Sequence, residues 1–200
     1  MNFKFYKNPV PHIVIDQFFT PEEYQKVWNE IMFLSPKMRT PDETGAAGSP
    51  RGYLKKGVGV FLENFYNNPR DSDIFICCKK IFDQVNVEKI SSSNFFFKPF
   101  QFVNLTDSAL LQMYRNGDFY QPHKDNSLYT AVTLVHKEPK QYNGGDFYFS
   151  ESNHVVELYS NQTIIFPSFA EHGVSEVKLL SNEIEDARFT ISQLLYLAPK

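Results

Sequence analysis

The sequence contains few of the features that mark secreted or membrane-spanning proteins. Only two of its 200 residues are cysteines, and these two, Cys77 and Cys78, are neighbours within an apolar run, where a disulfide between them is disfavoured. Residues 1–12 are too short and too polar for a secretion signal, and no segment approaches the roughly 18 apolar residues that a transmembrane helix needs. We therefore expect a soluble, cytoplasmic protein with two reduced thiols and no contact with membranes.

A large excess of charge of one sign is also missing. The formal net charge is −3 and the pI is near 6.0, so the protein has no strong overall field for attracting nucleic acid. Internal repeats and low-complexity segments are absent as well, and the length fits a single domain spanning residues 1–200. The sequence does not determine the oligomeric state.

Aromatic residues, by contrast, are abundant, with 20 Phe and 11 Tyr beside one Trp. Such side chains favour β-sheets. From Phe95 onward, short strand-like runs alternate with turn residues such as Asn143-Gly144-Gly145. The runs cover residues 95–104, 109–114, 128–136, 146–150, 154–158, 162–166, 173–179 and 187–197. We predict that residues 95–200 form a jelly-roll, also called a double-stranded β-helix, as the catalytic core.

The preceding part, residues 1–94, is predicted to be mainly helical, with strands at 12–15 and 58–62. A first helix begins at Pro21, where Thr20 and Glu23 form a capping box, and it ends near Leu34. A second helix, capped by Asp71, ends near Val87. Its expected buried stripe consists of Ile74, Cys77, Cys78, Ile81, Phe82 and Val85. The predicted fold class is therefore mainly β, with N-terminal helices packed on one sheet of the jelly-roll.

A long segment between these helices, residues 35–57, is rich in proline and paired small residues. Loops of this length in compact domains are often functional. We predict a mobile loop that is either a lid over an extended substrate or a plain surface excursion.

Two histidines and one aspartate form the chemically informative pattern. His123 and Asp125 are two residues apart, so on an extended chain both side chains project from the same face. His172 follows 49 residues later, after a strand-like run. Two neutral imidazoles and one carboxylate can bind iron(II) on one side and leave three neighbouring positions for other ligands. We predict that these three residues are the metal ligands and the catalytic centre.

Arg188 begins the last predicted strand and has strongly apolar neighbours. A dicarboxylate that chelates iron at one end needs a buried cation at its other end, and arginine binds a carboxylate with two parallel hydrogen bonds. Thr190 lies on the same face of this strand and offers a hydroxyl group. We predict that both residues bind such a co-substrate.

Three motifs together resemble the prolyl 4-hydroxylase-like 2-oxoglutarate oxygenases. Residues 114–125 match the family pattern Y-x-x-G-x-x-Y-x-x-H-x-D. Residues 144–147 are similar to the turn and strand that precede the distal histidine, and residues 166–174 are similar to F-P-x-x-x-x-H-x-V. The resemblance is close over residues 95–197 and looser before them.

The resemblance implies an iron(II)- and 2-oxoglutarate-dependent dioxygenase that uses O2, with ascorbate as a reductant. His123, Asp125 and His172 would bind iron, Arg188 would pair with the distal carboxylate of 2-oxoglutarate, and Tyr114 would donate its hydroxyl to the co-substrate. The carboxylate of Asp125 favours hydroxylation over halogenation. The expected substrate is a peptidyl residue such as proline, in a peptide or protein partner; a free amino acid or small molecule is the alternative, and nucleobase demethylation ranks lower.

Two departures from the family pattern affect these expectations. Arg188 follows His172 by sixteen residues, whereas relatives commonly space the basic residue by about nine or ten. Leu134 stands where relatives often carry a tyrosine. Tyr120 either lines the substrate entrance or only packs beside His123. Two other classes stay open: a jelly-roll binding module without catalysis, and a zinc hydrolase with the same three ligands.

Overall fold

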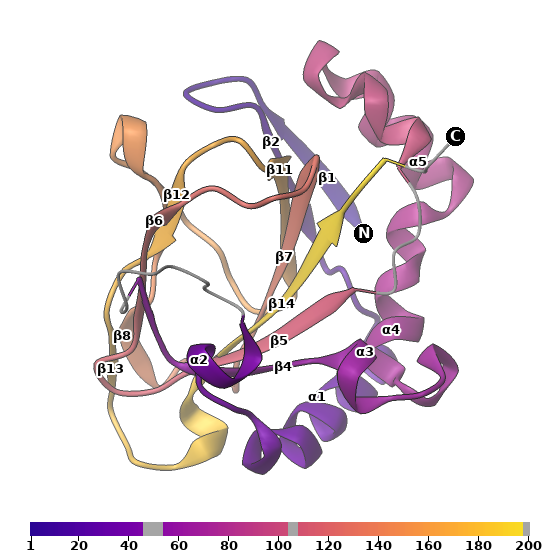
Figure 1. Cartoon of the computed structure of the whole chain (residues 1–200). Helices are drawn as coiled ribbons and strands as arrows, with labels where there is room; N and C mark the ends of the chain where they lie inside the picture. The colour runs from indigo at the N-terminus through magenta and orange to yellow at the C-terminus, as the bar shows by residue number, and fades with distance from the viewer. Residues whose placement is uncertain (46–53, 104–107, 198–200) are drawn as a thin grey trace.

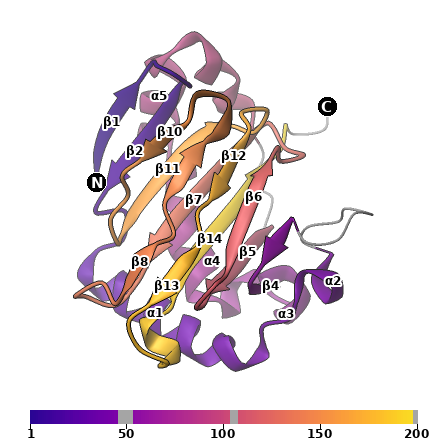
Figure 2. The ribbon, with the colours of Figure 1, turned by 90° about the vertical axis from the view of Figure 1, so that its left-hand side faces the viewer.

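Two antiparallel β-sheets lie face to face and form the centre of the molecule (Figure 1). The structure is a computed structural model, and it describes residues 1–45, 54–103 and 108–197. The helices gather against the outer face of the larger sheet, and a view turned by 90° shows the strands of the smaller sheet in front (Figure 2). The predicted class, a mainly β jelly-roll with helices on one sheet, is confirmed.

Seven strands form the larger sheet, and all neighbours in it are antiparallel. In spatial order they are β1 (Asn2–Tyr6), β2 (His12–Asp16), β11 (Gln162–Pro167), β7 (Tyr129–Val135), β14 (Arg188–Leu195), β5 (Ala109–Tyr114) and β4 (Val58–Phe61).

The smaller sheet has five strands, and a separate pair lies beside it. In spatial order the five are β10 (His154–Val156), β9 (Phe147–Phe149), β12 (His172–Val174), β6 (Phe119–His123) and β3 (Lys55–Lys56), and the pair is β13 (Val177–Leu179) with β8 (Tyr142–Gly144). Because β1 to β4 come from residues before 95, the N-terminal part contributes strands to both sheets as well as helices.

The helices are short apart from the first, and 3-10 turns connect several of them. The α-helices are α1 (Pro21–Leu34), α2 (Pro41–Thr44), α3 (Leu62–Phe65), α4 (Asp73–Cys78) and α5 (Gln84–Ser93). The 3-10 helices are η1 (Ser35–Lys37), η2 (Pro69–Asp71), η3 (Lys79–Phe82), η4 (Phe95–Phe102), η5 (Ser150–Ser152) and η6 (Ile184–Asp186). The capping box predicted at Thr20 and Glu23 is present, and α1 ends where the sequence indicated.

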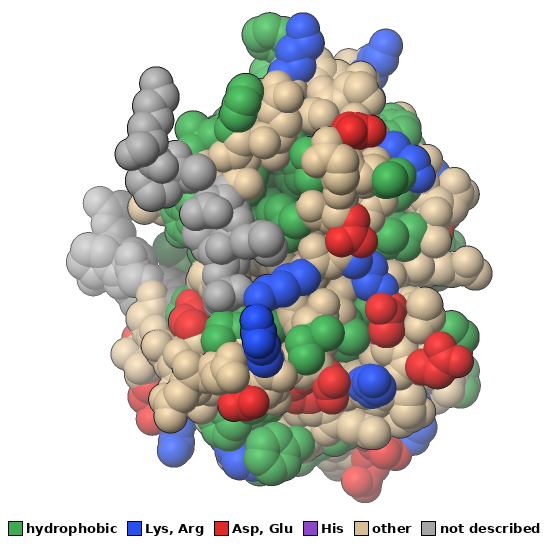
Figure 3. Space-filling view, turned by 90° about the vertical axis from the view of Figure 1, so that its right-hand side faces the viewer, with side chains coloured by type: hydrophobic (Ala, Val, Ile, Leu, Met, Phe, Trp, Pro, Cys, Tyr) green, Lys and Arg blue, Asp and Glu red, His purple; other side chains and the backbone are tan. Residues whose placement is uncertain are grey.

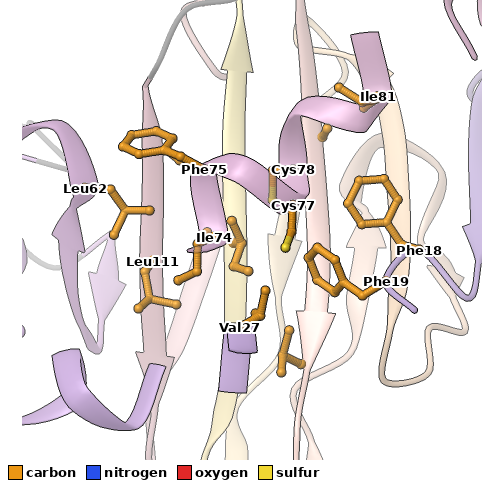
Figure 4. Packing of buried hydrophobic residues seen from close by; sticks show 14 of the residues in the cluster. Phe18, Phe19, Val27, Leu62, Ile74, Phe75, Cys77, Cys78, Ile81 and Leu111 are labelled. Carbon is orange, nitrogen blue, oxygen red and sulfur yellow. The ribbon is translucent and has the colours of Figure 1, made fainter. Parts of the chain in front are cut away.

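The central strands of the larger sheet are buried on both faces. Side chains at alternate positions point to the helices, and those between them point to the smaller sheet. Ile13 and Ile15 of β2 belong to the core under the helices, whereas Val14 packs between the sheets. On the helical side, Cys77 and Cys78 of α4 are buried and unpaired, as Figure 4 shows. The structure therefore has both thiols in the core with no disulfide between them, and their reduced state stays a prediction.

One predicted strand is wrong. Residues 95–102 form the 3-10 helix η4, in which Phe97 and Phe100 are buried while Phe95 and Phe102 are exposed. A spacing of three between buried residues matches the three residues per turn of a 3-10 helix. The hydroxyl of Tyr129 donates to the carbonyl of Phe96 at 2.6 Å, which fixes η4 to the sheet. Residue 104 of the predicted run lies outside the described residues.

The second predicted helix is wrong in detail. Ser72 rather than Asp71 caps α4, because its hydroxyl accepts a hydrogen bond from the backbone N–H of Phe75. The chain then passes through η3 before α5 begins, so the expected single stripe is interrupted and Val85 is exposed. Four strands of the described residues were not predicted, namely β1, β3, β6 and β8.

The predicted loop at 35–57 contains regular structure where it is described, namely η1, α2 and β3. Residues 46–53 lie outside the described residues, and closure of this segment over a substrate stays a prediction. In the part of the chain that the structure describes, no helix has the length and apolar character needed to cross a membrane. Figure 3 shows that acidic and basic side chains are intermixed on the face that carries the helices.

Candidate active site

His123 and His172 lie opposite each other on neighbouring strands of the smaller sheet. β6 and β12 pair antiparallel, with His172 in register with His123, and Figure 2 shows the two strands side by side. The two imidazole centroids are 4.3 Å apart. Asp125 follows β6, and its carboxylate oxygens lie 3.5 Å from Nε2 of each histidine. The three predicted ligands therefore converge, with one potential ligand atom from each within 4.8 Å of the others.

Both imidazoles are held with Nε2 toward the shared centre. Nδ1 of His123 lies 2.9 Å from the carbonyl oxygen of Gln121, and Nδ1 of His172 lies 3.0 Å from that of Ala170. A carbonyl oxygen only accepts, so each Nδ1 carries the proton and each Nε2 keeps a lone pair for a metal. Burial lowers the pKa of His172 to about 4, which leaves this imidazole neutral at pH 7.

Asp125 is ionised and fixed in position. Burial alone would raise its pKa, but the hydrogen bond with His123, the electrostatic interaction with the nearby His172 ring and the hydrogen bond from Thr130 together lower the pKa below its usual value. The hydroxyl of Thr130 donates to Oδ2 of Asp125 at 2.6 Å and lies 2.8 Å from the hydroxyl of Ser168. The carbonyl of Ser168 also accepts from the backbone N–H of Asp125.

The contact between Thr130 and Asp125 leads to a prediction about metal affinity. Replacing Thr130 with valine removes the hydroxyl that orients the carboxylate, and we expect iron(II) affinity to fall by about 10- to 100-fold. Titration with iron(II) or manganese(II) measures this. Thr133→Val is the matched control, since Thr133 is buried on the same strand but bonds to Thr163 instead. Equal losses in both variants would contradict an orienting role for Thr130.

Aromatic rings enclose the two histidines. Tyr120 stacks on His123 with centroids 3.6 Å apart and an angle of 13° between the rings. Phe166 meets the ring of His172 edge-on at 4.6 Å, and Phe147 stacks on it at 5.5 Å. Tyr120 thus packs on His123 and also lines the same cavity as the three candidate ligands. These contacts restrict rotation of both imidazoles.

Arg188 reaches the same cavity despite its distance from His172 in the sequence. The extra residues form η6 and the loop around it, and β14 begins at Arg188 in register with Tyr114 of β5. The cavity between the sheets is lined by the three candidate ligands together with Tyr114, Arg188 and Thr190. The lengthened connection therefore does not displace this arginine from the interior.

The guanidinium of Arg188 is buried without an anion. The residue is 1% exposed, and within the described structure its Nε and Nη1 atoms have no hydrogen-bond partner. An unpaired buried cation is costly, so this arrangement fits a carboxylate ligand. The ring of Tyr114 lies beside the guanidinium, 5.2 Å from Cζ to the ring centroid. Burial raises the pKa of Tyr114, which keeps its hydroxyl protonated as a donor.

Thr190 and Leu134 are two further residues that were singled out in the sequence, and both lie close to Arg188. The hydroxyl of Thr190 faces the cavity but donates to Oε1 of Gln112 at 3.2 Å. Ser192 donates to the same oxygen at 3.1 Å. Leu134 pairs with Thr190 across the strands and lines a neighbouring hollow with Arg188 and Tyr142. Leu134 therefore supplies apolar contact near the arginine rather than near the metal ligands.

Gly145 makes room for Arg188, and this leads to a second prediction. A Cβ atom added to Gly145 would lie 2.6 Å from Cδ of Arg188, and the φ angle is +68°. Gly145→Ala is therefore expected to displace the guanidinium and to lower 2-oxoglutarate affinity by about tenfold or more.

Gly45→Ala is the matched control, because Gly45 has a φ angle of +69° but no atom within 4 Å of the added Cβ. Both variants bear the same backbone strain, so binding isotherms and melting temperatures of the two isolate the clash at Arg188. A similar co-substrate affinity in both would contradict the prediction.

A larger hollow, of about 760 Å³, lies elsewhere, beside the start of α1 and the end of β7. Its polar groups bond to one another: the hydroxyl of Tyr24 donates to the carbonyl of His136 at 2.8 Å and contacts the hydroxyl of Ser160. The smaller cavity is the one that contains the three candidate ligands and Arg188. We therefore choose it as the candidate site because of the residues that line it, although the other hollow is larger.

Several residues of the site were not found from the sequence. Thr130 and Gln112 are ordinary residues of β-strands and Ser168 lies in the turn after β11, and no local pattern connects them with the site. Lys55, at the end of the 35–57 segment, was not predicted as a site residue either. The structure buries it beside Tyr120, with Nζ 5.1 Å from the ring centroid.

Comparisons with known proteins agree with this geometry. Residues 109–196 match the model of the 2OG-Fe(II) oxygenase superfamily. No sequence among the curated proteins matches the chain. Similar solved structures include a prolyl hydroxylase from Trichoplax adhaerens in complex with a hypoxia inducible factor oxygen degradation domain peptide fragment, a prolyl-4-hydroxylase from Pseudomonas putida, and OsALKBH1.

These three structures are distant in sequence. The Trichoplax protein has a TM-score of 0.65 at 13% identity, covering 94% of this chain and 84% of its own. The Pseudomonas protein has a TM-score of 0.63 at 15% identity, with coverage of 96% and 95%. OsALKBH1 has a TM-score of 0.61 at 15% identity, with coverage of 98% and 100%. Likeness at this identity establishes the fold.

Proposed function

From the match of residues 109–196 to the 2OG-Fe(II) oxygenase superfamily, we propose that this chain is an oxygenase of that superfamily and hydroxylates a C–H bond of a peptidyl residue, with proline as the first candidate. The superfamily uses iron(II), 2-oxoglutarate and O2. One observation carries the proposal: the three candidate metal ligands and an arginine without an anion line a single cavity.

Each group of residues in the site has its own proposed role in binding. His123, Asp125 and His172 would hold iron(II), which when bound supplies the oxidising chemistry. Arg188 would neutralise the distal carboxylate of 2-oxoglutarate, and the hydroxyl of Tyr114 would donate to the co-substrate. The aromatic rings around the histidines exclude water from the reacting centre. Ascorbate as a reductant is part of the proposal and has no binding residue assigned.

The choice of a peptide rests on the prolyl hydroxylases among the similar folds, one of which was solved with a peptide. OsALKBH1 has a comparable TM-score, so the fold by itself does not select the substrate. A free amino acid or small molecule is the second candidate. The net charge of −3 argues against a nucleic-acid substrate. A cytoplasmic location stays a prediction, supported by the two unpaired thiols.

The proposal is tested by incubating the protein with iron(II), 2-oxoglutarate and a peptide library under air. We expect succinate release and products heavier by one oxygen atom in the mass spectrum. A binding module would release no succinate, and a zinc hydrolase would turn over its substrate without 2-oxoglutarate. Either of those results would overturn the proposed function.

A further inference from the structure

Lys55 is a second buried cation, next to two tyrosines that line the cavity of the candidate active site. It lies on β3, the edge strand of the smaller sheet, in register with Tyr120. The residue is 6% exposed, whereas its neighbour Lys56 is exposed and points to the opposite side of the strand. Its Nζ lies 5.1 Å from the ring centroid of Tyr120 and 5.8 Å from that of Tyr114. Lys55 therefore faces the cavity side of β6.

Among the described residues, the ammonium of Lys55 has ring contacts but neither an ion pair nor a hydrogen bond. Lys56, by contrast, has an acidic neighbour, with Nζ 4.0 Å from Oδ1 of Asp118. Contact with tyrosine rings offsets only part of the cost of burying a charge. Burial lowers the pKa of Lys55 to about 7, although the charge of Asp125 opposes this. The protein thus holds a lysine where a charge is unfavourable unless an anion binds.

The charges of the site indicate which molecule supplies that anion. Tyr114 has both Arg188 and Lys55 beside its ring, and among the described residues that line the cavity Asp125 has the one carboxylate. With iron(II) and the doubly negative co-substrate bound as in the proposed function, the two carboxylates of the co-substrate have the metal and Arg188 as partners. One positive charge, that of Lys55, then stays without a partner.

We propose that Lys55 binds a carboxylate of the primary substrate, so that the enzyme selects molecules with an acidic group close to the hydroxylated carbon. This inference rests on the proposed function, because the charge count includes iron(II) and 2-oxoglutarate. The carboxylate belongs either to an acidic side chain in a peptide or to a free amino acid.

The test measures binding without turnover. Protein loaded with manganese(II) and 2-oxoglutarate, without oxygen, is equilibrated with two libraries of proline-containing peptides. One library contains Asp and Glu at the positions where the other contains Asn and Gln, and the two are otherwise identical. A parallel arm compares L-proline with L-prolinamide. We expect the acidic form to bind about tenfold more tightly in one arm, and that arm identifies the source of the carboxylate. Equal binding of acid and amide forms in both arms would overturn the proposal.

Variants of Lys55 and Lys56 show which of these two lysines causes the preference for the acidic form. Lys55→Met is expected to remove the preference for the acidic form and to change 2-oxoglutarate affinity by less than about twofold, whereas Lys56→Met keeps the preference. If Lys55→Met instead weakens 2-oxoglutarate about tenfold and keeps the preference, the cation serves the co-substrate and the proposal is wrong.

Stability provides a separate readout. Because Lys55→Met removes a buried ammonium without an anion, we expect its melting temperature to equal or exceed that of the parent protein. Lys55→Arg keeps the cation and should keep the preference, which covers the case in which the methionine variant does not fold. Loss of the preference in a folded Lys55→Arg variant would count against a carboxylate partner. Failure of the proposed function would show separately, as absence of succinate release from the parent protein with iron(II) under air.

Discussion

Replacing Asp125 with asparagine is expected to reduce succinate release from 2-oxoglutarate on the order of a thousandfold, equivalent to about 4 kcal/mol of transition-state stabilisation. The amide has nearly the shape of the carboxylate and can still accept the hydrogen bond from Thr130. It lacks the negative charge that balances the metal ion. The loss should therefore appear in metal binding and turnover rather than in folding.

His172→Ala should give a similar loss, because it removes a neutral imidazole whose Nε2 faces the same centre. His154→Ala is the control, since His154 lies on β10 outside the ligand cluster and packs near His12. Iron(II) titration and succinate assays on the three variants, with melting curves for each, measure the effects. Succinate release at the parent rate from Asp125→Asn or from His172→Ala would show that the metal ligands are assigned incorrectly.

Replacing Arg188 with methionine is expected to raise the 2-oxoglutarate concentration needed for half-saturation by about 100-fold, since two hydrogen bonds to a charged group are worth about 3 kcal/mol. Two nitrogen atoms of the guanidinium, Nε and Nη1, have no hydrogen-bond partner in the described structure, and methionine fills much of the same space. Without co-substrate the variant should be at least as stable as the parent protein, because a buried unpaired cation has been removed.

Arg115→Met is the control for this prediction. Arg115 is exposed, with its Nε 3.8 Å from Asp118, and it follows the same strand that carries Tyr114. Isothermal titration of 2-oxoglutarate into the anaerobic manganese(II) protein gives the affinity, and thermal unfolding without ligand gives the stability. An unchanged affinity in Arg188→Met would place the anchor of the distal carboxylate elsewhere in the cavity.

The predictions for the metal-ligand variants and for the Arg188 variant distinguish the part of the site that binds the metal from the part that binds the co-substrate. Loss of Asp125 or His172 should abolish metal binding, while loss of Arg188 should leave the metal bound and weaken the co-substrate alone. Gly145→Ala should resemble the arginine variant, and Thr130→Val should resemble a mild form of the aspartate variant. These groupings follow from the contacts of each residue.

Much of the fold could be predicted because the patterns are local. The capping box at Thr20 and Glu23 and most strands from 109 onward depend on neighbouring residues, and the structure has them close to where they were predicted. The exceptions after 109 are β6 and β8, which were missed, and the run at 173–179, which forms two strands, β12 and β13. The run at 95–104 failed because a continuous aromatic segment has no period of its own. Which of its rings are buried depends on the sheet that they meet, and Phe97 and Phe100 pack on Tyr129.

By itself, the sequence predicted which residues would carry the chemistry and determined which class of fold holds them. The His123-x-Asp125 spacing needs only an extended chain, and the alternation of strands and turns is local as well. Only the tertiary structure decided which distant groups meet. Hydrogen bonding between β6 and β12 sets His172 opposite His123, and the register of β14 on β5 returns Arg188 to the cavity after a lengthened loop. The pairing of β3 with β6 turns Lys55 inward. Strand register depends on pairing between segments far apart in the chain, which no local pattern records.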